Sequence, residues 1–186
     1  MNENHNHNQQ AGNLRTDRSM LTGMFSDRAS TENAYAALQE KGYTKDEINL
    51  VMSDDTRKTH FSGAVKDTEI GTKAAEGAGK GSAIGGTVGA IAGVIAAVGT
   101  SIAIPGLGLI IAGPIAAGLA GAGAGGITGG VIGALVGSGI PEARAKLYES
   151  GIKEGNIVMG VKPRNDEDAR YLEENWRSNK AEEIHI

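Results

Sequence analysis

The sequence predicts an α+β fold, namely a ferredoxin-like sandwich of two strand–helix–strand (βαβ) halves interrupted by an apolar insertion. Three observations support this. Residues 19–53 and 156–186 each read as strand, helix and strand, and they resemble each other. Residues 81–141 contain no Asp, Glu, Lys, Arg or His. We therefore expect four parts: a disordered tail (1–18), a first βαβ half with a linker (19–69), a Gly/Ala-rich apolar helical hairpin (70–140), and an amphipathic helix with the second βαβ half (141–186).

The N-terminal tail is predicted to be disordered from its composition. Residues 1–18 are rich in Asn, Gln and His and have no apolar period. His5 and His7 could bind a metal weakly, but they are interpreted as solvated side chains because no carboxylate or cysteine joins them. We predict no metal site.

The first βαβ half begins with an apolar strand at residues 19–25. Either Asp27 or Ser30 can cap the helix that follows, and Gly42 ends it. A second strand covers residues 47–53, after which residues 54–69 are a polar linker with some helix. The positions expected to be buried are Ala34, Ala37 and Leu38 in the helix and Ile48, Leu50 and Met52 in the second strand.

The second half follows an amphipathic helix that Pro141 starts and that ends near Gly155. A strand then covers residues 156–162, Asn165 or Asp166 caps a helix, and a closing strand covers 183–186. The positions expected to be buried are Ala143, Leu147 and Tyr148 in the amphipathic helix and Ala169, Leu172 and Trp176 in the last helix.

The internal repeat rests on two matches between the halves. Residues 21–24 match 158–161, with a glycine at the same place, and residues 30–34 match 165–169 after a two-residue contraction. Two such halves predict a four-stranded antiparallel sheet with helices on one face.

The apolar insertion contains two ladders of small residues spaced four apart, which on a helix lie nearly above one another. Each ladder makes a groove without side chains, which lets a second helix approach closely. We expect helices over 81–100 and 113–137, joined by 101–112, and we expect the ladders to mediate helix packing and self-association. The first ladder is Gly77, Gly81, Gly85, Gly89, Gly93 and Ala97, and the second is Ala117, Gly121, Gly125, Gly129, Gly133 and Gly137.

Glycine destabilises a helix in water by about 0.5–1 kcal/mol per residue relative to Ala. Close helix contact, lipid or burial in an oligomer must offset this. Each expected helix is long enough for a bilayer, but the apolar connection favours a hairpin that dips into lipid without emerging, or one buried among copies. Lys73 and Lys80 at its base could meet lipid phosphates or simply be exposed, and both interpretations stay open.

The chain also resembles a known family. The segments MLTGMFSDRASTENAYAALQEKGYTKDEINLVMS, IAIPGLGLIIAGPIAAGLAGAGAGG and GIPEARAKLYESGIKEGNIVMGV are similar to the general stress proteins of the YflT type, often described as heat-induced. The similarity covers roughly residues 20–174. It implies a stress-associated, non-enzymatic protein and brings no catalytic residues.

Composition excludes several kinds of chemistry. The formal charge of −4 argues against nucleic acid as a partner, and the lack of cysteine excludes thiolate chemistry. Residues 76–82 mimic the GAGKGT core of a phosphate-binding loop, but no apolar strand feeds them and Ala74 stands where the pattern needs its first glycine. We predict no catalytic residue, no cofactor and no small-molecule substrate.

Three functional hypotheses remain. The first is a membrane-associated protein in the cytoplasm, at or in the inner membrane, since the N-terminus shows no secretory signal. The second is a homo-oligomeric assembly or shell with the hairpins in its core, and the two overlap. The third, a small-molecule sensor on the ferredoxin-like sheet, rests on fold analogy alone.

Overall fold

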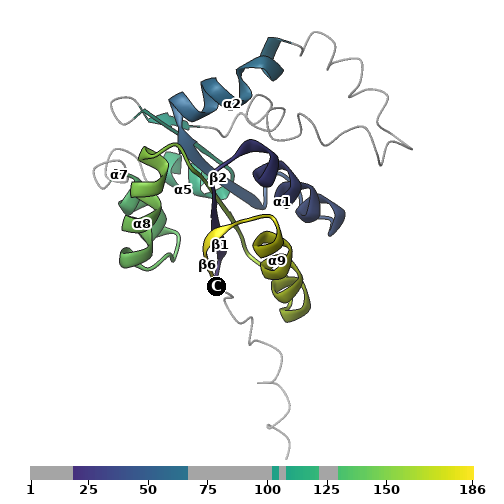
Figure 1. Cartoon of the computed structure of the whole chain (residues 1–186). Coiled ribbons are helices and arrows are strands. Elements are labelled where there is room, and N and C mark those ends of the chain that lie inside the picture. Colours follow the sequence, from purple (N-terminus) through teal and green to yellow (C-terminus); the bar gives the residue numbers. More distant parts are fainter. Residues whose placement is uncertain (1–18, 67–101, 105–107, 122–129) are drawn as a thin grey trace, which may run out of the picture.

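The fold is a mixed α/β arrangement around one sheet (Figure 1). The structure is a computed structural model that describes residues 19–66, 102–104, 108–121 and 130–186. The predicted tail (1–18) and the first predicted helix of the hairpin (81–100) lie outside the described residues. The strands are β1 (Leu21–Phe25), β2 (Ile48–Ser53), β3 (Ile102–Ile104), β4 (Leu109–Ala112), β5 (Ile157–Val161) and β6 (Glu182–His185). The helices are α1 (Arg28–Glu40), α2 (Asp54–Lys66), α5 (Pro114–Gly121), α7 (Gly130–Gly137), α8 (Glu142–Lys153) and α9 (Asp166–Ser178).

The described strands form a six-stranded sheet in the order β3-β4-β2-β5-β1-β6. Every neighbouring pair is antiparallel. The four strands expected from the two βαβ halves are all present and are contiguous, with β5 and β1 in the centre. The predicted strand and helix positions in both halves are therefore confirmed to within a few residues, and the predicted linker after β2 is the helix α2.

The two additional strands correct the prediction for residues 101–112, which we expected to join two helices. This segment contains β3 and β4, and β4 pairs with β2 from Leu50↔Ala112 to Ser53↔Leu109. The physical reason is the edge of β2, whose free N–H and C=O groups would otherwise face solvent. All four residues of β4 are buried, with Ile110 and Ala112 in one core and Leu109 and Ile111 in the other.

Both faces of the sheet are covered, whereas we expected helices on one face. Alternate residues of β2 explain this, because Leu50 and Met52 pack with α1 and α9 while Val51 packs with α8 on the opposite side. Figure 1 shows α1 and α9 on one side of the sheet and α5, α7 and α8 on the other. The first core includes Phe25, Tyr35, Leu38, Leu172 and Trp176, and the second includes Ile111, Ile115, Leu135, Tyr148 and Ile152.

Helix ends follow the predicted local rules. The Asp27 carboxylate accepts a hydrogen bond from the Ser30 backbone N–H at 2.8 Å, and the Asn165 side chain accepts one from Asp168 N–H at 2.7 Å. Gly42 has a φ of 78°, and Tyr43 N–H then donates to Leu38 C=O at 3.0 Å. This is the glycine-terminated end that the sequence predicted.

Helix α8 presents a different face from the one expected. Ala145, Tyr148 and Ile152 are buried, so Tyr148 is confirmed. Ala143 is exposed and Leu147 is 48% exposed, which makes both predictions wrong. The buried stripe steps by three and four residues from Ala145. Ile140, which precedes α8, is buried in the same core as this stripe.

Candidate apolar interaction surface

The second predicted helix of the hairpin, over residues 113–137, is two eight-residue helices, α5 and α7, within its described part. Gly130, the first residue of α7, has a φ of 58°, through which a right-handed helix does not continue. Gly118 and Gly133 line the same groove, while one continuous helix would hold them roughly 20 Å apart. The prediction of a single helix over residues 113–137 is therefore wrong.

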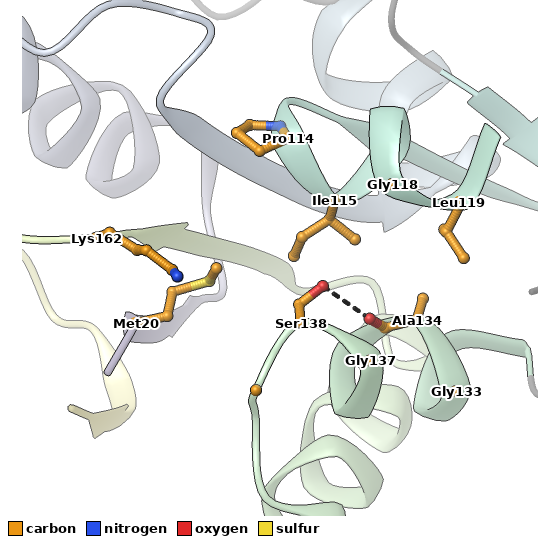
Figure 2. A pocket seen from close by; sticks show the side chains of 11 residues that line it. Met20, Pro114, Ile115, Gly118, Leu119, Gly133, Ala134, Gly137, Ser138 and Lys162 are labelled. Carbon is orange, nitrogen blue, oxygen red and sulfur yellow. Dashed lines mark hydrogen bonds between the residues drawn. The ribbon is translucent and has the colours of Figure 1, made fainter. Parts of the chain in front are cut away.

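The two helices face each other across a groove of about 560 Å³, which we call the α5–α7 groove (Figure 2). Each helix lines it with two adjacent rows of residues spaced four apart, so that a defined stripe of each helix faces the space. Helix α5 contributes Pro114, Ile115, Gly118 and Leu119, α7 contributes Gly133, Ala134 and Gly137, and Met20, Ser138, Gly139 and Lys162 complete the lining.

The groove is open because its glycines lack side chains. A Cβ atom added at Gly118, Gly133 or Gly137 would meet no atom of the described residues within 4 Å. Beneath them, Ile115 and Ala134 are buried in the core on that side of the sheet. The surface therefore combines an apolar base with three positions at which a neighbouring molecule can approach the backbone.

Two residues of β2 and one glycine fix the position of α5. The buried Asn49 side chain accepts a hydrogen bond from the Ile115 backbone N–H at 2.8 Å and donates to Gly160 C=O at 3.3 Å. Gly113, with a φ of 94°, lies against the backbone of Ile48, where a Cβ atom would overlap the Ile48 carbonyl. Asn49 thus satisfies one of the free N–H groups at the start of α5, and Gly113 lets the helix begin directly on the sheet.

The end of α7 is fixed by its own backbone. Gly139, with a φ of 89°, follows the helix, and Ile140 N–H donates to Leu135 C=O at 3.1 Å. The Ser138 hydroxyl donates to the Ala134 carbonyl at 2.9 Å, so this polar group faces the helix rather than a ligand (Figure 2). Both walls of the groove are consequently held by defined hydrogen bonds.

The predicted ladder residues have different positions. Gly133 and Gly137 line the groove, and Gly121 is the last residue of α5. Ala117 is exposed and is not part of the lining, because the row of α5 that faces the groove is shifted by one residue to Pro114 and Gly118. The other predicted rungs, Gly77, Gly81, Gly85, Gly89, Gly93, Ala97, Gly125 and Gly129, lie outside the described residues, so the ladders' role in self-association stays a prediction.

Sequence reasoning missed the lining residues Met20 and Lys162 and the positioning residue Asn49. Met20 and Lys162 flank β1 and β5, far from the insertion in sequence, and only the pairing of the strands brings them to the groove. One signal existed for Asn49, a polar residue among the apolar residues of the second predicted strand. A buried amide there must have hydrogen-bond partners.

A polar cluster around Tyr43, away from the groove, stabilises the fold. Tyr43 donates to the Asp168 carboxylate at 2.9 Å, accepts from the Arg164 backbone N–H at 2.9 Å, and packs under the Arg164 guanidinium. This cluster joins the turn after α1 to the turn before α9. Within the described ranges no group of three or more His, Asp or Glu residues is arranged to hold a metal ion.

No helix in the described part of the chain combines the length and the apolar character needed to cross a bilayer. Comparison with family models, curated proteins and solved structures finds no match for this sequence. The resemblance to the general stress proteins therefore stays a prediction.

Proposed function

We propose that this chain is a non-enzymatic, stress-type protein of the cytoplasm that associates with the inner membrane through its apolar insertion. The observation that supports this best is the α5–α7 groove, an apolar surface that remains uncovered within the described structure. Val136, next to the groove on α7, is 42% exposed. Exposed apolar surface beside an apolar groove is typical of a site that contacts lipid or another protein.

We infer that the rest of the chain is a ferredoxin-like scaffold. The supporting facts are the contiguous order β2-β5-β1-β6 and the placement of α1 and α9 on one face of these strands. In this interpretation β3, β4, α5, α7 and α8 belong to an insertion between the two halves. Its helices α5, α7 and α8 pack on the face opposite α1 and α9, where α5 and α7 form the groove.

Sedimentation with vesicles tests the membrane proposal. We expect the purified chain to sediment with liposomes of mixed neutral and anionic phospholipid, and cell fractionation to recover it with membranes. The substitution Gly133→Leu changes the lining of the groove, whereas Ala117→Leu adds the same side chain at an exposed position of α5 outside it. Recovery of the parent chain entirely in the supernatant, without detergent, would contradict the proposal.

A second candidate function, homo-oligomeric assembly, is favoured by the open glycines. Gly133 and Gly137 are spaced four apart on α7, and none of the described residues fills the space above them, which suits the close approach of a helix from another copy. Native mass measurement with and without detergent tests it. We expect Gly89→Leu, Gly129→Leu and Gly133→Leu to reduce the mass, and a monomer for the parent chain in both conditions would refute assembly.

A further inference from the structure

We propose that Met20 is a site of covalent modification, at which a hydroperoxide oxidises the thioether to a sulfoxide and thereby loosens helix α5. The sulfur of Met20 contacts the side-chain amide of Asn49, and the same amide holds the first turn of α5. This inference is independent of the proposed membrane role, because it concerns a chemical change within the chain and needs neither lipid nor a second copy.

Met20 differs from the other described methionines in its access to small molecules. It lines the α5–α7 groove and is 9% exposed, whereas Met52 and Met159 are 1% and 0% exposed. Met24 is 8% exposed but does not line the groove. Figure 2 shows the Met20 side chain at one end of the groove. A groove of about 560 Å³ admits hydrogen peroxide, which therefore reaches Met20 more readily than the methionines enclosed in the cores.

The sulfur of Met20 is packed on one side only. A Cβ atom added at Gly160 would lie 2.9 Å from this sulfur, so the thioether rests directly on β5 at a residue without a side chain. An oxygen atom added to the sulfur is therefore directed away from β5, toward the groove or toward Asn49.

The oxidation transfers one oxygen atom from the hydroperoxide to the sulfur. A sulfur lone pair attacks the terminal oxygen of the hydroperoxide, and the O–O bond breaks as the S–O bond forms. The proton on the transferred oxygen passes to the leaving oxygen. The sulfur loses two electrons and becomes a sulfoxide, while the hydroperoxide is reduced to an alcohol, or to water where hydrogen peroxide is the oxidant.

The new oxygen is a strong acceptor next to the Asn49 amide. Asn49 Nδ2 lies 3.8 Å from the thioether sulfur, a weak acceptor, and donates to the Gly160 carbonyl over 3.3 Å. A sulfoxide oxygen competes for this donor. Because the amide is planar, turning Nδ2 toward the sulfoxide moves Oδ1 away from the Ile115 N–H, from which it accepts at 2.8 Å. Oxidation thus weakens the hydrogen bond that fixes the start of α5.

Met24 provides a matched comparison within the same strand. Its sulfur accepts a hydrogen bond from Asn156 Nδ2 at 3.5 Å, and the Asn156 backbone N–H donates to the Gly151 carbonyl at 2.9 Å. Asn156 therefore connects Met24 to the end of α8, whereas Asn49 connects Met20 to α5. Oxidation of Met24 is expected to leave the first turn of α5 unchanged.

Treatment of the folded, full-length chain with hydrogen peroxide, followed by peptide mapping with tandem mass spectrometry, tests the site. We expect Met20 to be oxidised before Met52 and Met159. Hydrogen–deuterium exchange then reports on α5. We expect the backbone N–H groups of its first turn to exchange roughly three- to tenfold faster after oxidation, as the weakening of one hydrogen bond predicts.

Two variants assign the effect to one sulfur. Met20→Leu keeps the side-chain volume without the sulfur and should abolish the peroxide-induced change in α5, whereas Met24→Leu should retain it. The proposal is overturned if Met20 is oxidised no faster than Met52 and Met159, or if oxidised Met20 leaves the exchange of α5 unchanged. It is also overturned if the change persists in Met20→Leu or disappears in Met24→Leu. The first two outcomes are measured on the parent chain and do not depend on the folding of a variant.

Discussion

Three buried tyrosines differ in how their hydroxyl groups are satisfied. Tyr148 donates to the Glu183 carbonyl at 2.7 Å and lies 2.8 Å from the Thr22 hydroxyl, which ties β6 and β1 to α8. The Tyr43 hydroxyl has two partners between α1 and α9. The Tyr35 hydroxyl is buried without a hydrogen-bond partner among the described residues, and its burial, together with the nearby Asp46 charge, raises its pKa to about 12.

We predict that Tyr35→Phe stabilises the protein. Removing a buried hydroxyl that has no partner relieves its desolvation penalty, for which we expect a gain of about 1 kcal/mol in the free energy of unfolding. The same change at Tyr43 or Tyr148 removes hydrogen bonds and should lower stability by about 1 kcal/mol. Urea unfolding of the three variants measures this, and a loss of stability in Tyr35→Phe equal to that in Tyr148→Phe would show that Tyr35 has a partner.

The cap of α1 gives a pH prediction. Hydrogen bonds from the Ser30 backbone N–H and hydroxyl hold the pKa of Asp27 below its ordinary value of 3.8. A carboxyl whose folded pKa is depressed stabilises the fold above its unfolded pKa, and this contribution is lost as the pH falls through the folded value. We therefore expect part of the stability to disappear below about pH 4.

The matched variant for this effect is Asp27→Asn, which keeps the cap but cannot titrate. Asn and Asp cap helices about equally well, whereas Ala at this position costs about 1 kcal/mol. Thermal unfolding between pH 3 and pH 7 should show a smaller acid loss in Asp27→Asn than in the parent, and Asp27→Ala should be less stable near neutral pH. Identical acid profiles in parent and Asp27→Asn would exclude this carboxyl as the source.

At the scale of elements, the sequence located the strands and helices of both halves because caps and alternation are local signals. The predicted match of residues 21–24 with 158–161, however, aligned the two halves incorrectly. Gly23 faces Trp176 in one core, whereas Gly160 faces Met20 in the other, so the matched glycines lie on opposite faces of the sheet. A shift of one residue along a strand reverses its faces. The caps Asp27 and Asn165 give the better alignment, since both halves then bury the positions four, seven and eleven residues beyond the cap.

The insertion was harder to predict because its ladders of small residues favoured helix throughout, although a short apolar run suits a buried strand equally well. Gly, Ala, Ile and Leu alternate too little to distinguish strand from helix, so periodicity alone could not separate β4 from a continuation of the hairpin. The tertiary pairing of β4 with the edge of β2 decides that this segment forms a strand. The groove was predictable only in part. Sequence reasoning identified Gly133 and Gly137, but on α5 it selected the row that contains Ala117, one residue away from the row of Pro114 and Gly118 that lines the groove.

The junction between β4 and α5 supplies a prediction about one element. Gly113→Ala would place a Cβ atom against the Ile48 carbonyl at a φ of 94°, so we expect a loss of several kcal/mol or failure to fold. The control is Gly118→Ala, five residues on, where the added methyl meets open space within a helix. That change should be neutral or stabilise by about 0.5–1 kcal/mol. Equal melting temperatures for the two variants would contradict this account of Gly113.

At the scale of the whole molecule, two cores share one sheet. The core under α1 and α9 and the core under α5, α7 and α8 have no residue in common, but β1, β2 and β5 contribute side chains to both. Loss of packing on one face leaves the strands without the contacts that order them for the other. We therefore expect the described cores to unfold as a single cooperative unit.

The single tryptophan makes this cooperativity measurable. Trp176 is fully buried in the core under α1 and α9, in edge-to-face contact with Phe25, and its fluorescence reports on that core alone. Leu135→Ala removes a buried side chain from the opposite core and should cost about 2–5 kcal/mol. We expect it to lower the urea midpoint of Trp176 fluorescence and of far-ultraviolet circular dichroism by the same amount. A fluorescence midpoint that stays at the parent value while the dichroism midpoint falls would mean that the insertion folds independently of the βαβ scaffold.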